Sequence, residues 1–265
     1  MLYALGVGLG SNPVDPKELQ YTYEAHLRVL PTMATVIGSP GFWLENPRTG
    51  ADAIRLVHGE QYLRIHRPLP THGTVVARNR VESLTDKGVG KGALAVVTRD
   101  LVDAESGDLL SRGTHVSFLR GDGGFSAEDG LSDPSPRPLP GTPQRPADVE
   151  VVLETVPQAA LIYRLSGDYN PLHADLTIAT KAGFSRPILH GLCTYGLACH
   201  AVLRACVDYD PDGIRSLAVR FTSPVYPGEA VRFELWQENQ HHWRLRATVD
   251  ARGCVVLNNG EVEIH

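Results

Sequence analysis

Alternating apolar and polar residues mark two groups of β-strands along the chain. In the first part of the sequence the alternating segments are residues 61–66, 71–86, 92–103 and 109–120. In the last part they are residues 216–221, 231–253 and 255–264. Turns with glycine, such as those at Gly73 and Gly107, separate neighbouring segments. Each group therefore predicts a run of antiparallel strands.

Two apolar stretches predict helices. Residues 191–206, with the sequence GLCTYGLACHAVLRAC, form a long apolar stretch with small side chains throughout. A second helical segment is predicted from about Tyr23 to Leu30 and on toward Val36. Each helix precedes a run of strands, so a plan of helix and then sheet occurs twice. The pattern predicts an α+β protein, although two unrelated α+β domains would also satisfy it.

A segment between the two groups has the composition of a linker. Residues 123–148 are rich in Gly, Pro, Ser and charged residues, so they can bury little apolar surface. We therefore divide the chain into an N-terminal unit of residues 1–122, a linker of residues 123–148 and a C-terminal unit of residues 149–265. The length of 265 residues is sufficient for two small domains with buried cores.

Charge and cysteine content narrow the class of protein. The formal net charge is −5, which argues against nucleic acid and anionic membranes as general partners. The four cysteines, Cys193, Cys199, Cys206 and Cys254, contain no CxxC pair. The first three lie on the predicted helix, where we expect them to pack. A reducing, cytoplasmic location is expected.

Neither end of the sequence resembles a targeting signal. The stretch MLYALGVGLG is apolar, but it is short, lacks basic residues and continues into Ser11-Asn12-Pro13. It predicts neither a signal peptide nor a membrane span. The last residues, Glu263-Ile264-His265, do not form a peroxisomal signal.

An acid, an amide and an imidazole occur close together in the sequence GDYNPLH, residues 167–173. Asp168 and His173 are five positions apart, so they would not share one face of a continuous helix. Pro171 disfavours the helical conformation for Asn170 and suits the first position of a helix. We therefore expect Asn170 to cap a helix, with His173 in its first turn and Asp168 on the preceding loop.

Two titratable side chains that converge beside a helix N-terminus can transfer protons. The helix predicted to begin at Gly191 would add backbone N–H groups and a positive dipole end, which suit an oxyanion. The same acid, amide and proline also occur as structural caps, although capping does not need an imidazole. Residue types alone leave the catalytic and the structural interpretation open.

Further motifs make the chain resemble a known family. They are YALGVG at residues 3–8, LQYTYE at 19–24, LPT at 30–32, HGEQ at 58–61, DKG at 86–88, YRLSGDYNPLHAD at 163–175 and FTSPVYPG at 221–228. Nearly the whole chain is similar to the MaoC-like (R)-specific enoyl-CoA hydratases of the two-domain hydratase 2 type, found in peroxisomal multifunctional enzyme type 2 and in bacterial relatives. The resemblance implies a double hotdog fold, in which each repeat is a long helix wrapped by an antiparallel sheet.

The resemblance also implies a reaction. Asp168 and His173 would hold one water and add it to C3 of a trans-2-enoyl thioester, with Asp168 as the main base. Asn170 would position the water or the pair, and the backbone N–H of Gly191 would stabilise the thioester oxyanion. Because the thioester itself activates C2 and C3, we expect no cofactor beyond the CoA of the substrate. No ligand spacing such as CxxC indicates a metal.

Four residues match family positions that contact the CoA thioester: His58, Gly59, Lys87 and Phe221. Without the resemblance, Lys87 could be an ordinary solvated lysine, His58 a loop residue that bonds to the backbone, and Phe221 a core residue. Glu24 matches a family glutamate, and we interpret it as structural support.

The resulting prediction is reversible hydration of trans-2-enoyl-CoA to (3R)-3-hydroxyacyl-CoA, as in fatty-acid β-oxidation, by a homodimer. The first unit lacks the catalytic motif and is expected to form a tunnel for medium or long acyl chains, lined by its helix and strands. The alternatives are a dehydratase acting on acyl-carrier-protein thioesters, a hotdog thioesterase and an acyl-CoA-binding protein without activity.

Overall fold

The computed structural model describes residues 1–127 and 130–265. Glu128 and Asp129, which belong to the predicted linker, lie outside the described residues. Nine strands occur in the described part, and they form one antiparallel sheet in the order β2-β3-β4-β1-β6-β9-β8-β7-β5. Their bounds are β1 Leu56–Ile65, β2 Val75–Asp86, β3 Ala93–Asp103, β4 Leu109–Leu119, β5 Val149–Glu154, β6 Ile214–Phe221, β7 Ala230–Gln237, β8 His242–Val249 and β9 Cys254–Ile264.

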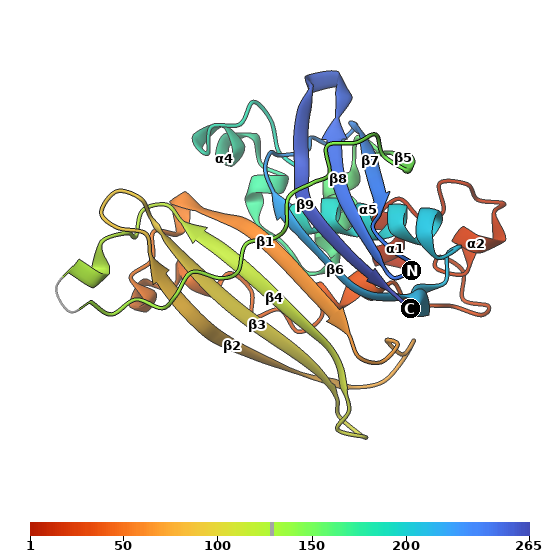
Figure 1. Cartoon of the computed structure of the whole chain (residues 1–265), viewed down its shortest axis with the longest axis horizontal. Helices are drawn as coiled ribbons and strands as arrows, with labels where there is room; N and C mark the ends of the chain where they lie inside the picture. Colours follow the sequence, from red (N-terminus) through yellow and green to blue (C-terminus); the bar gives the residue numbers. More distant parts are fainter. Residues whose placement is uncertain (128–129) are drawn as a thin grey trace.

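Strands β1 and β6 join the two halves of the sheet. Residues 60–64 of β1 pair with residues 216–220 of β6, while the other edge of β1 pairs with β4. Figure 1 shows the long strands β1–β4 on one side of the molecule and the C-terminal strands on the other. The β1–β6 pair therefore makes one continuous sheet from the N-terminal and C-terminal strands.

The long helix α5 spans Gly191–Cys206, so the predicted helix is confirmed with the same bounds. Every residue from Cys193 to Leu203 is buried, so the helix is surrounded by protein on all sides. The N-terminal segment covers one side of it. A Cβ atom at Gly196 would lie 2.4 Å from Val7 Cγ1, so glycine is what allows this segment to approach the helix.

The helix predicted between Tyr23 and Leu30 is wrong. Residues 23–30 form turns and coil, and a short 3-10 helix, η1 (Pro31–Thr35), follows them. Leu30 has φ −66° and ψ 134°, the extended conformation favoured before a proline. His26 has a positive φ of 60°, which also interrupts a helix. The N-terminal half of the sheet is therefore covered by η1 and irregular chain instead of a long helix.

The remaining helices are short. The α-helices are α1 Leu2–Gly6, α2 Pro16–Leu19, α3 Ala159–Tyr163 and α4 Leu176–Lys181. The other 3-10 helices are η2 Trp43–Glu45, η3 Pro47–Thr49, η4 Ala53–Arg55, η5 Phe125–Ala127, η6 Arg164–Ser166, η7 Pro171–His173, η8 Pro211–Gly213 and η9 Asp250–Arg252.

The seven predicted strand segments are all found as strands, with two differences. Residues 231–253, predicted as one alternating segment, contain two strands, β7 and β8. Strand β5 is not among the predicted segments, although it alternates in burial, with Val151 and Leu153 buried between exposed residues. It occupies the end of the sheet beside β7.

Parts of the predicted linker lie against the sheet. The backbone of Asp133 donates to the Leu84 carbonyl at the outer edge of β2 (3.0 Å), and its Oδ2 accepts from the Leu84 N–H (2.7 Å). Further along, the Leu139 carbonyl accepts from Asn259 Nδ2 of β9 (3.2 Å), and the Leu139 side chain is buried. These contacts hold the segment on both halves of the sheet.

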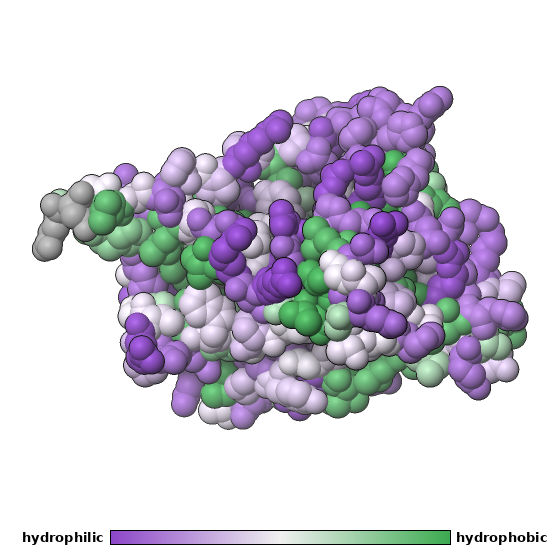
Figure 2. All heavy atoms as spheres, turned by 90° about the horizontal axis from the view of Figure 1, so that it is seen from below, coloured by the Kyte–Doolittle hydropathy of each residue, from purple (hydrophilic) through white to green (hydrophobic). Residues whose placement is uncertain are grey.

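The helices, the cysteines and the surface also bear on the sequence-based expectations. No helix within residues 1–127 and 130–265 is long and apolar enough to cross a membrane. The four cysteines are free thiols, and Cys193 and Cys199 are buried on α5. On the face shown in Figure 2, hydrophobic atoms form several separate patches among hydrophilic ones. The apolar surface on that face is therefore divided.

Candidate active site

The loop that carries Asp168 is built as the sequence predicts, but the helix after it is shorter. Gly167 has φ 109°, a left-handed conformation that turns the chain before Asp168. Asn170 caps η7, because its Oδ1 accepts from the backbone N–H of Leu172 (3.0 Å). The cap is confirmed, yet η7 is a single 3-10 turn, and a second cap at Asp175 starts α4.

Asp168 and His173 converge with a third side chain, His190. One ligand atom from each of these residues lies within 4.8 Å of the other two. His173 is 8% exposed, and its Nδ1 is 2.9 Å from the Ile188 carbonyl. Since a carbonyl can only accept, Nδ1 carries the hydrogen, and the Nε2 of a neutral His173 is left as an acceptor.

The His173 imidazole favours its neutral form. Burial is the largest cause, and it lowers the pKa of His173 below the usual value. The hydrogen bond to Ile188 and the charge of Asp168 act in the opposite direction and are smaller. Because η7 has only three residues, its dipole adds little to this effect of burial.

His190 is absent from the predicted site residues. Its ring stacks on His173 with centroids 3.7 Å apart, and its Nε2 is 3.2 Å from the backbone carbonyl of Asp168. Burial and then the neighbouring His173 lower the pKa of His190 to about 4. The sequence signal for this residue is its place directly before Gly191, at the N-cap of the long helix.

Asp168, His173 and His190 are close enough to suggest a metal site, but the two rings face each other. Their planes are inclined by only 27° at a centroid distance of 3.7 Å. A metal ion must lie near the plane of each imidazole that binds it, along the nitrogen lone pair. Stacked rings do not direct their lone pairs to one point, so this arrangement suits proton transfer better than metal binding.

The start of α5 brings the two halves of the protein together. A Cβ atom at Gly191 would lie 3.4 Å from the ring of Phe221, at the end of β6. The Phe221 ring is 4.5 Å from the ring of His58 on β1. His58 and Phe221, two of the predicted substrate-binding residues, therefore lie next to the backbone N–H predicted to hold the oxyanion.

A second pair of stacked imidazoles lies behind Phe221. His58 stacks on His115 of β4 at 3.7 Å, and His115 Nε2 is 2.8 Å from Ser117 Oγ. Burial, followed by the neighbouring His115, lowers the pKa of His58 well below its usual value, and burial lowers that of His115 to about 4. His115 is not a predicted residue, but the alternation of β4 places it and Ser117 on the same face.

Gly59 and Lys87 occupy different surroundings. Gly59 lies at an irregularity between β1 and β4, where a Cβ atom would be 3.2 Å from the Val116 carbonyl. Lys87 is exposed in the turn between β2 and β3, and in the described chain it has no contact with the Asp168 cluster. Glu24 is exposed outside the cluster as well.

The turn that carries Lys87 is nevertheless well fixed. The carboxylate of Asp86 accepts from the backbone N–H groups of Gly88 (2.7 Å), Gly124 (2.7 Å) and Ser126 (2.9 Å). These hydrogen bonds hold the pKa of Asp86 well below its usual range. Lys87 therefore projects from a defined turn at the end of the sheet where β1 begins.

An apolar hollow opens beside the Asp168 loop. It has a volume of about 360 Å³ and is lined by Met1, Leu2, Tyr3, Met33, Val36, Ile37, Leu165 and Ser166. Ser166 is only two residues before Asp168, so the hollow is next to the cluster. Its other wall comes from the segment where the predicted first helix is missing.

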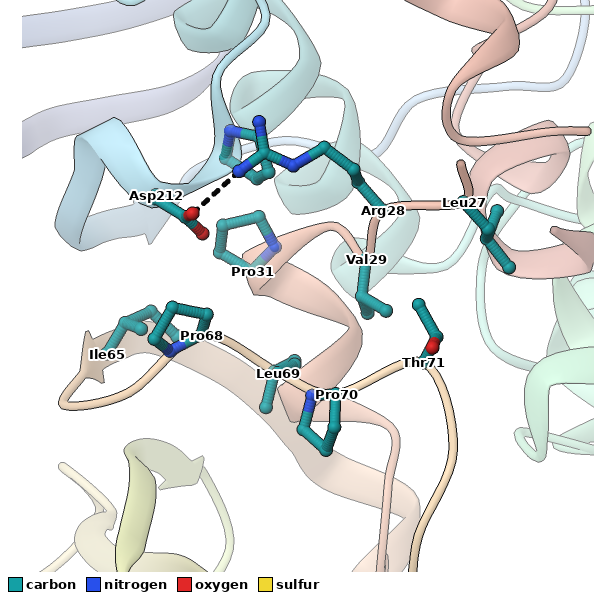
Figure 3. A pocket seen from close by; sticks show the side chains of 11 residues that line it. Leu27, Arg28, Val29, Pro31, Ile65, Pro68, Leu69, Pro70, Thr71 and Asp212 are labelled. Carbon is teal, nitrogen blue, oxygen red and sulfur yellow. Dashed lines mark hydrogen bonds and ion pairs between the residues drawn. The ribbon is translucent and has the colours of Figure 1, made fainter. Parts of the chain in front are cut away.

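A second, smaller hollow of about 220 Å³ lies near Ile65, at the other end of β1 from His58 (Figure 3). At about 3.3 Å per residue, the seven positions between them place it roughly 20 Å from the His58 end of the strand. Figure 3 shows an ion pair between Arg28 and Asp212 and several prolines among the residues that line it. Arg28 Nη2 and Asp212 Oδ2 are 2.6 Å apart. The hollow beside Ser166 is therefore the one that lies next to the Asp168 cluster.

Comparison with known proteins identifies the family. Residues 1–121 match the family model of the MFE-2 hydratase 2 N-terminal domain, and residues 138–258 match the MaoC like domain. The chain belongs to the MaoC-like hydratase 2 family. The predicted family is therefore confirmed, and this member carries its Asp168 and His173 in the second matched segment.

Relatives of this hydratase 2 family member extend over nearly its whole length. The peroxisomal enoyl-CoA hydratase 2 of Arabidopsis thaliana is 39% identical over 249 residues, which are 89% of this chain and 80% of that protein. The crystal structure of a MaoC-like dehydratase from Phytophthora capsici is 32% identical, with a TM-score of 0.85, over 100% of this chain and 90% of that one.

A more distant structure supports the fold alone. A Mycobacterium tuberculosis protein described as a double hotdog is 17% identical, with a TM-score of 0.55, over 90% of this chain and 82% of that one. The double hotdog is confirmed for this hydratase 2 family member. Its first repeat departs from the predicted form because the long helix occurs only in the second.

Buried imidazoles should make stability depend on pH. His173, His190 and His200 are each 8% exposed or less, and burial is the first cause that lowers each pKa, to about 4 for His190. The unfolded chain, with a histidine pKa of about 6.5, therefore binds protons more readily than the folded one. We predict that this stabilisation is complete above pH 6.5 and is lost as the pH falls toward 4.

Chemical denaturation at a series of pH values measures the effect. Each proton bound only by the unfolded chain contributes a slope of up to about 1.4 kcal/mol per pH unit to the free energy of unfolding. His200 lies on α5 with Nδ1 3.3 Å from the Val7 carbonyl, outside the candidate site. His200→Gln should reduce the slope of the free energy of unfolding against pH by up to the contribution of one proton. An unchanged slope would contradict the assignment of His200 as a buried, neutral imidazole.

Proposed function

We propose that this protein catalyses the reversible hydration of trans-2-enoyl-CoA to 3-hydroxyacyl-CoA. The observation that carries the proposal is the convergence of the Asp168 carboxylate and the His173 imidazole beside the N-terminus of α5. The Arabidopsis relative is named an enoyl-CoA hydratase 2, and the matched N-terminal model is that of hydratase 2. The proposed enzyme is a lyase, and its reaction uses water and groups of the protein itself.

Asp168 and His173 can share one water. A carboxylate oxygen of Asp168 and a ring nitrogen of His173 lie within 4.8 Å of each other, and a water with hydrogen bonds of about 2.8 Å can bridge two polar atoms at that separation. Asp168 Oδ1 also accepts from the backbone N–H of Asn170 (3.2 Å), which fixes the carboxylate. Asn170 thus positions the pair through its backbone, while its side-chain oxygen caps η7.

The proton balance of the reaction follows from this pair. As the water oxygen bonds to C3, the pair takes one proton from it, and the electrons of the C2–C3 double bond move toward the thioester oxygen. When the thioester carbonyl re-forms, C2 receives a proton from the pair, and the enzyme returns to its starting state. Asp168 acts as the main base, and the neutral His173 Nε2 is the second acceptor.

The growing negative charge is held by the backbone N–H of Gly191. This group is the first of a 16-residue helix, and the preceding His190 side chain forms no cap hydrogen bond with the first turn. The positive end of the helix and the N–H together favour an oxyanion. Phe221 and His58 line the approach of the thioester, and Lys87 is proposed as a partner for a CoA phosphate.

The acyl tail is assigned to the apolar hollow beside Ser166. Its volume of about 360 Å³ falls within the range of known ligand pockets. Met33 of η1 and the following Val36 and Ile37 form one wall, in the segment toward which the first helix was predicted to extend. Medium or long acyl chains are therefore proposed, and the tunnel wall is this segment in place of the predicted helix.

Two further properties remain proposals. A homodimer is proposed from the family resemblance, and light scattering in solution tests it. A reducing, cytoplasmic location is proposed from the four free cysteines and is tested by locating the protein in cells.

Asp168→Asn and His173→Ala should each lower kcat for crotonyl-CoA hydration by about 10²- to 10⁴-fold, because each removes one proton acceptor. Since the two groups share one water, the double variant should be little worse than the worse single one. The loss of enoyl absorbance measures the rate, and circular dichroism checks the fold. A single variant with a wild-type rate would remove Asp168 and His173 from the mechanism.

Two substitutions at Gly191 test separately the role of its backbone N–H and the role of its missing side chain. Gly191→Pro deletes the N–H and should abolish activity. Gly191→Ala keeps it and adds a Cβ 3.4 Å from Phe221, a contact that a small shift accommodates, so kcat should fall more mildly. Steady-state rates with crotonyl-CoA measure both variants. Equal, mild losses would mean that the oxyanion is bound elsewhere.

Filling the hollow should change chain-length preference. Val36→Trp narrows it, so kcat/KM for decenoyl-CoA should fall by about tenfold or more while that for crotonyl-CoA is unchanged. Val14→Trp, at a residue that is 81% exposed, is the matched control. Chiral analysis of the product should give the (3R) isomer. Parallel losses for both substrates would refute the tail assignment, and a (3S) product would refute the stereochemistry.

A further inference from the structure

His190 lies in the candidate site beside both Asp168 and His173. It is 1% exposed, and its ring lies between those of His173 (3.7 Å) and Tyr163 (5.0 Å). Its Nε2 is 3.2 Å from the backbone carbonyl of Asp168. The peptide bond after it supplies the N–H of Gly191. One residue is thus connected to all three proposed reacting groups.

The hydrogen bond to Asp168 fixes the state of this imidazole. The carbonyl can only accept, so Nε2 must carry a hydrogen. Nδ1 is buried and has no hydrogen-bond partner in the described chain. A charged His190 would place an N–H at that buried, unpartnered position, which costs free energy. The neutral ring with its hydrogen on Nε2 is therefore the form that fits the site.

The loop on the other side of this bond has few supports of its own. Gly167 begins it in a left-handed conformation, and a Cβ atom there would contact nothing within 4 Å. Besides His190, the loop is held by the hydrogen bond from the Gly167 N–H to the Arg164 carbonyl (3.1 Å), by the one from the Asn170 N–H to Asp168 Oδ1 (3.2 Å), and by the Arg164 guanidinium on the Tyr169 carbonyl (3.3 Å). Loss of the His190 bond would leave Asp168 free to move away from His173.

We propose that His190 is a positioning residue that holds the Asp168 loop and the His173 ring in place relative to the N–H of Gly191. The hydrogen bond from Nε2 fixes the loop, the stacked ring supports His173, and the backbone links both to α5. The proposal rests on the proposed function, because it assumes that these three groups act on the substrate.

Two substitutions distinguish positioning from simple filling of the core. His190→Phe keeps a ring of similar size but removes the donor. His190→Gln loses the ring but can present an N–H at a similar distance from the backbone. If the hydrogen bond matters, the glutamine variant is the more active; if only packing matters, the phenylalanine variant is. His200→Phe and His200→Gln, at a buried histidine of the helix that follows His190, are the matched controls.

Steady-state kinetics with crotonyl-CoA provide the first test. We expect His190→Phe to lower kcat by about 10²-fold with KM little changed, since a displacement of about 1 Å can cost that much. His190→Gln should recover most of the rate, and both His200 variants should stay near wild type. Equal rates for the two His190 variants, or a faster phenylalanine variant, would overturn the proposal.

Nitrogen-15 NMR of the wild-type imidazoles is the second test, and it needs no variant to fold. At pH 7, His190 should be neutral with its hydrogen on Nε2. A hydrogen on Nδ1, or a charged ring, would overturn the proposal. The tautomer can be as expected even if the protein hydrates no enoyl-CoA, so failure of the proposed function and failure of the positioning role give different results.

Discussion

The antiparallel pairing of β1 with β6 is the contact on which the site depends. It joins residues 60–64 to residues 216–220, and it fixes which side chains of the two repeats meet. His58 lies just before the paired stretch and Phe221 just after it, so their rings approach to 4.5 Å. A shift of one residue in this register would turn these side chains to opposite faces of the sheet. The first repeat thereby contributes to a site whose proposed acid and base, Asp168 and His173, lie in the second.

The sequence was sufficient for the long helix of the second repeat and for most strands of both repeats, but not for the helix expected in the first. The stretch 191–206 is long, mainly apolar and free of proline, so its helix could be predicted to the residue. Around Tyr23 the apolar residues were equally suggestive, but they anchor irregular chain: Tyr21 is fully buried and bonds to the Tyr209 carbonyl at 2.6 Å, and Leu30 is buried before Pro31. Tertiary contacts of this kind override local periodicity, and no pattern in the sequence reports them.

Some residues of the candidate site could be predicted from the sequence, and others could not. Asp168, Asn170 and His173 form one short motif whose turn could be read from Pro171, and the structure gives the expected cap. His190 and His115 come from distant segments, and each is defined by a ring stacked on another imidazole. Such pairs depend on where a helix start or a strand face comes to lie. Only the folded chain reveals that two pairs of imidazoles flank the start of α5.

The segment after Ser132 has a consequence for the behaviour of the molecule in a crowded solution. Ser132 and Asp133 have no regular secondary structure, and they form hydrogen bonds with the backbone groups of Leu84 and Asp86 at the open edge of β2. Unpaired groups on such a strand are templates for the addition of another chain. The connection between the repeats therefore also shields part of the sheet from self-association, and proteolytic cleavage within it would favour aggregation even if every active-site residue remained in place.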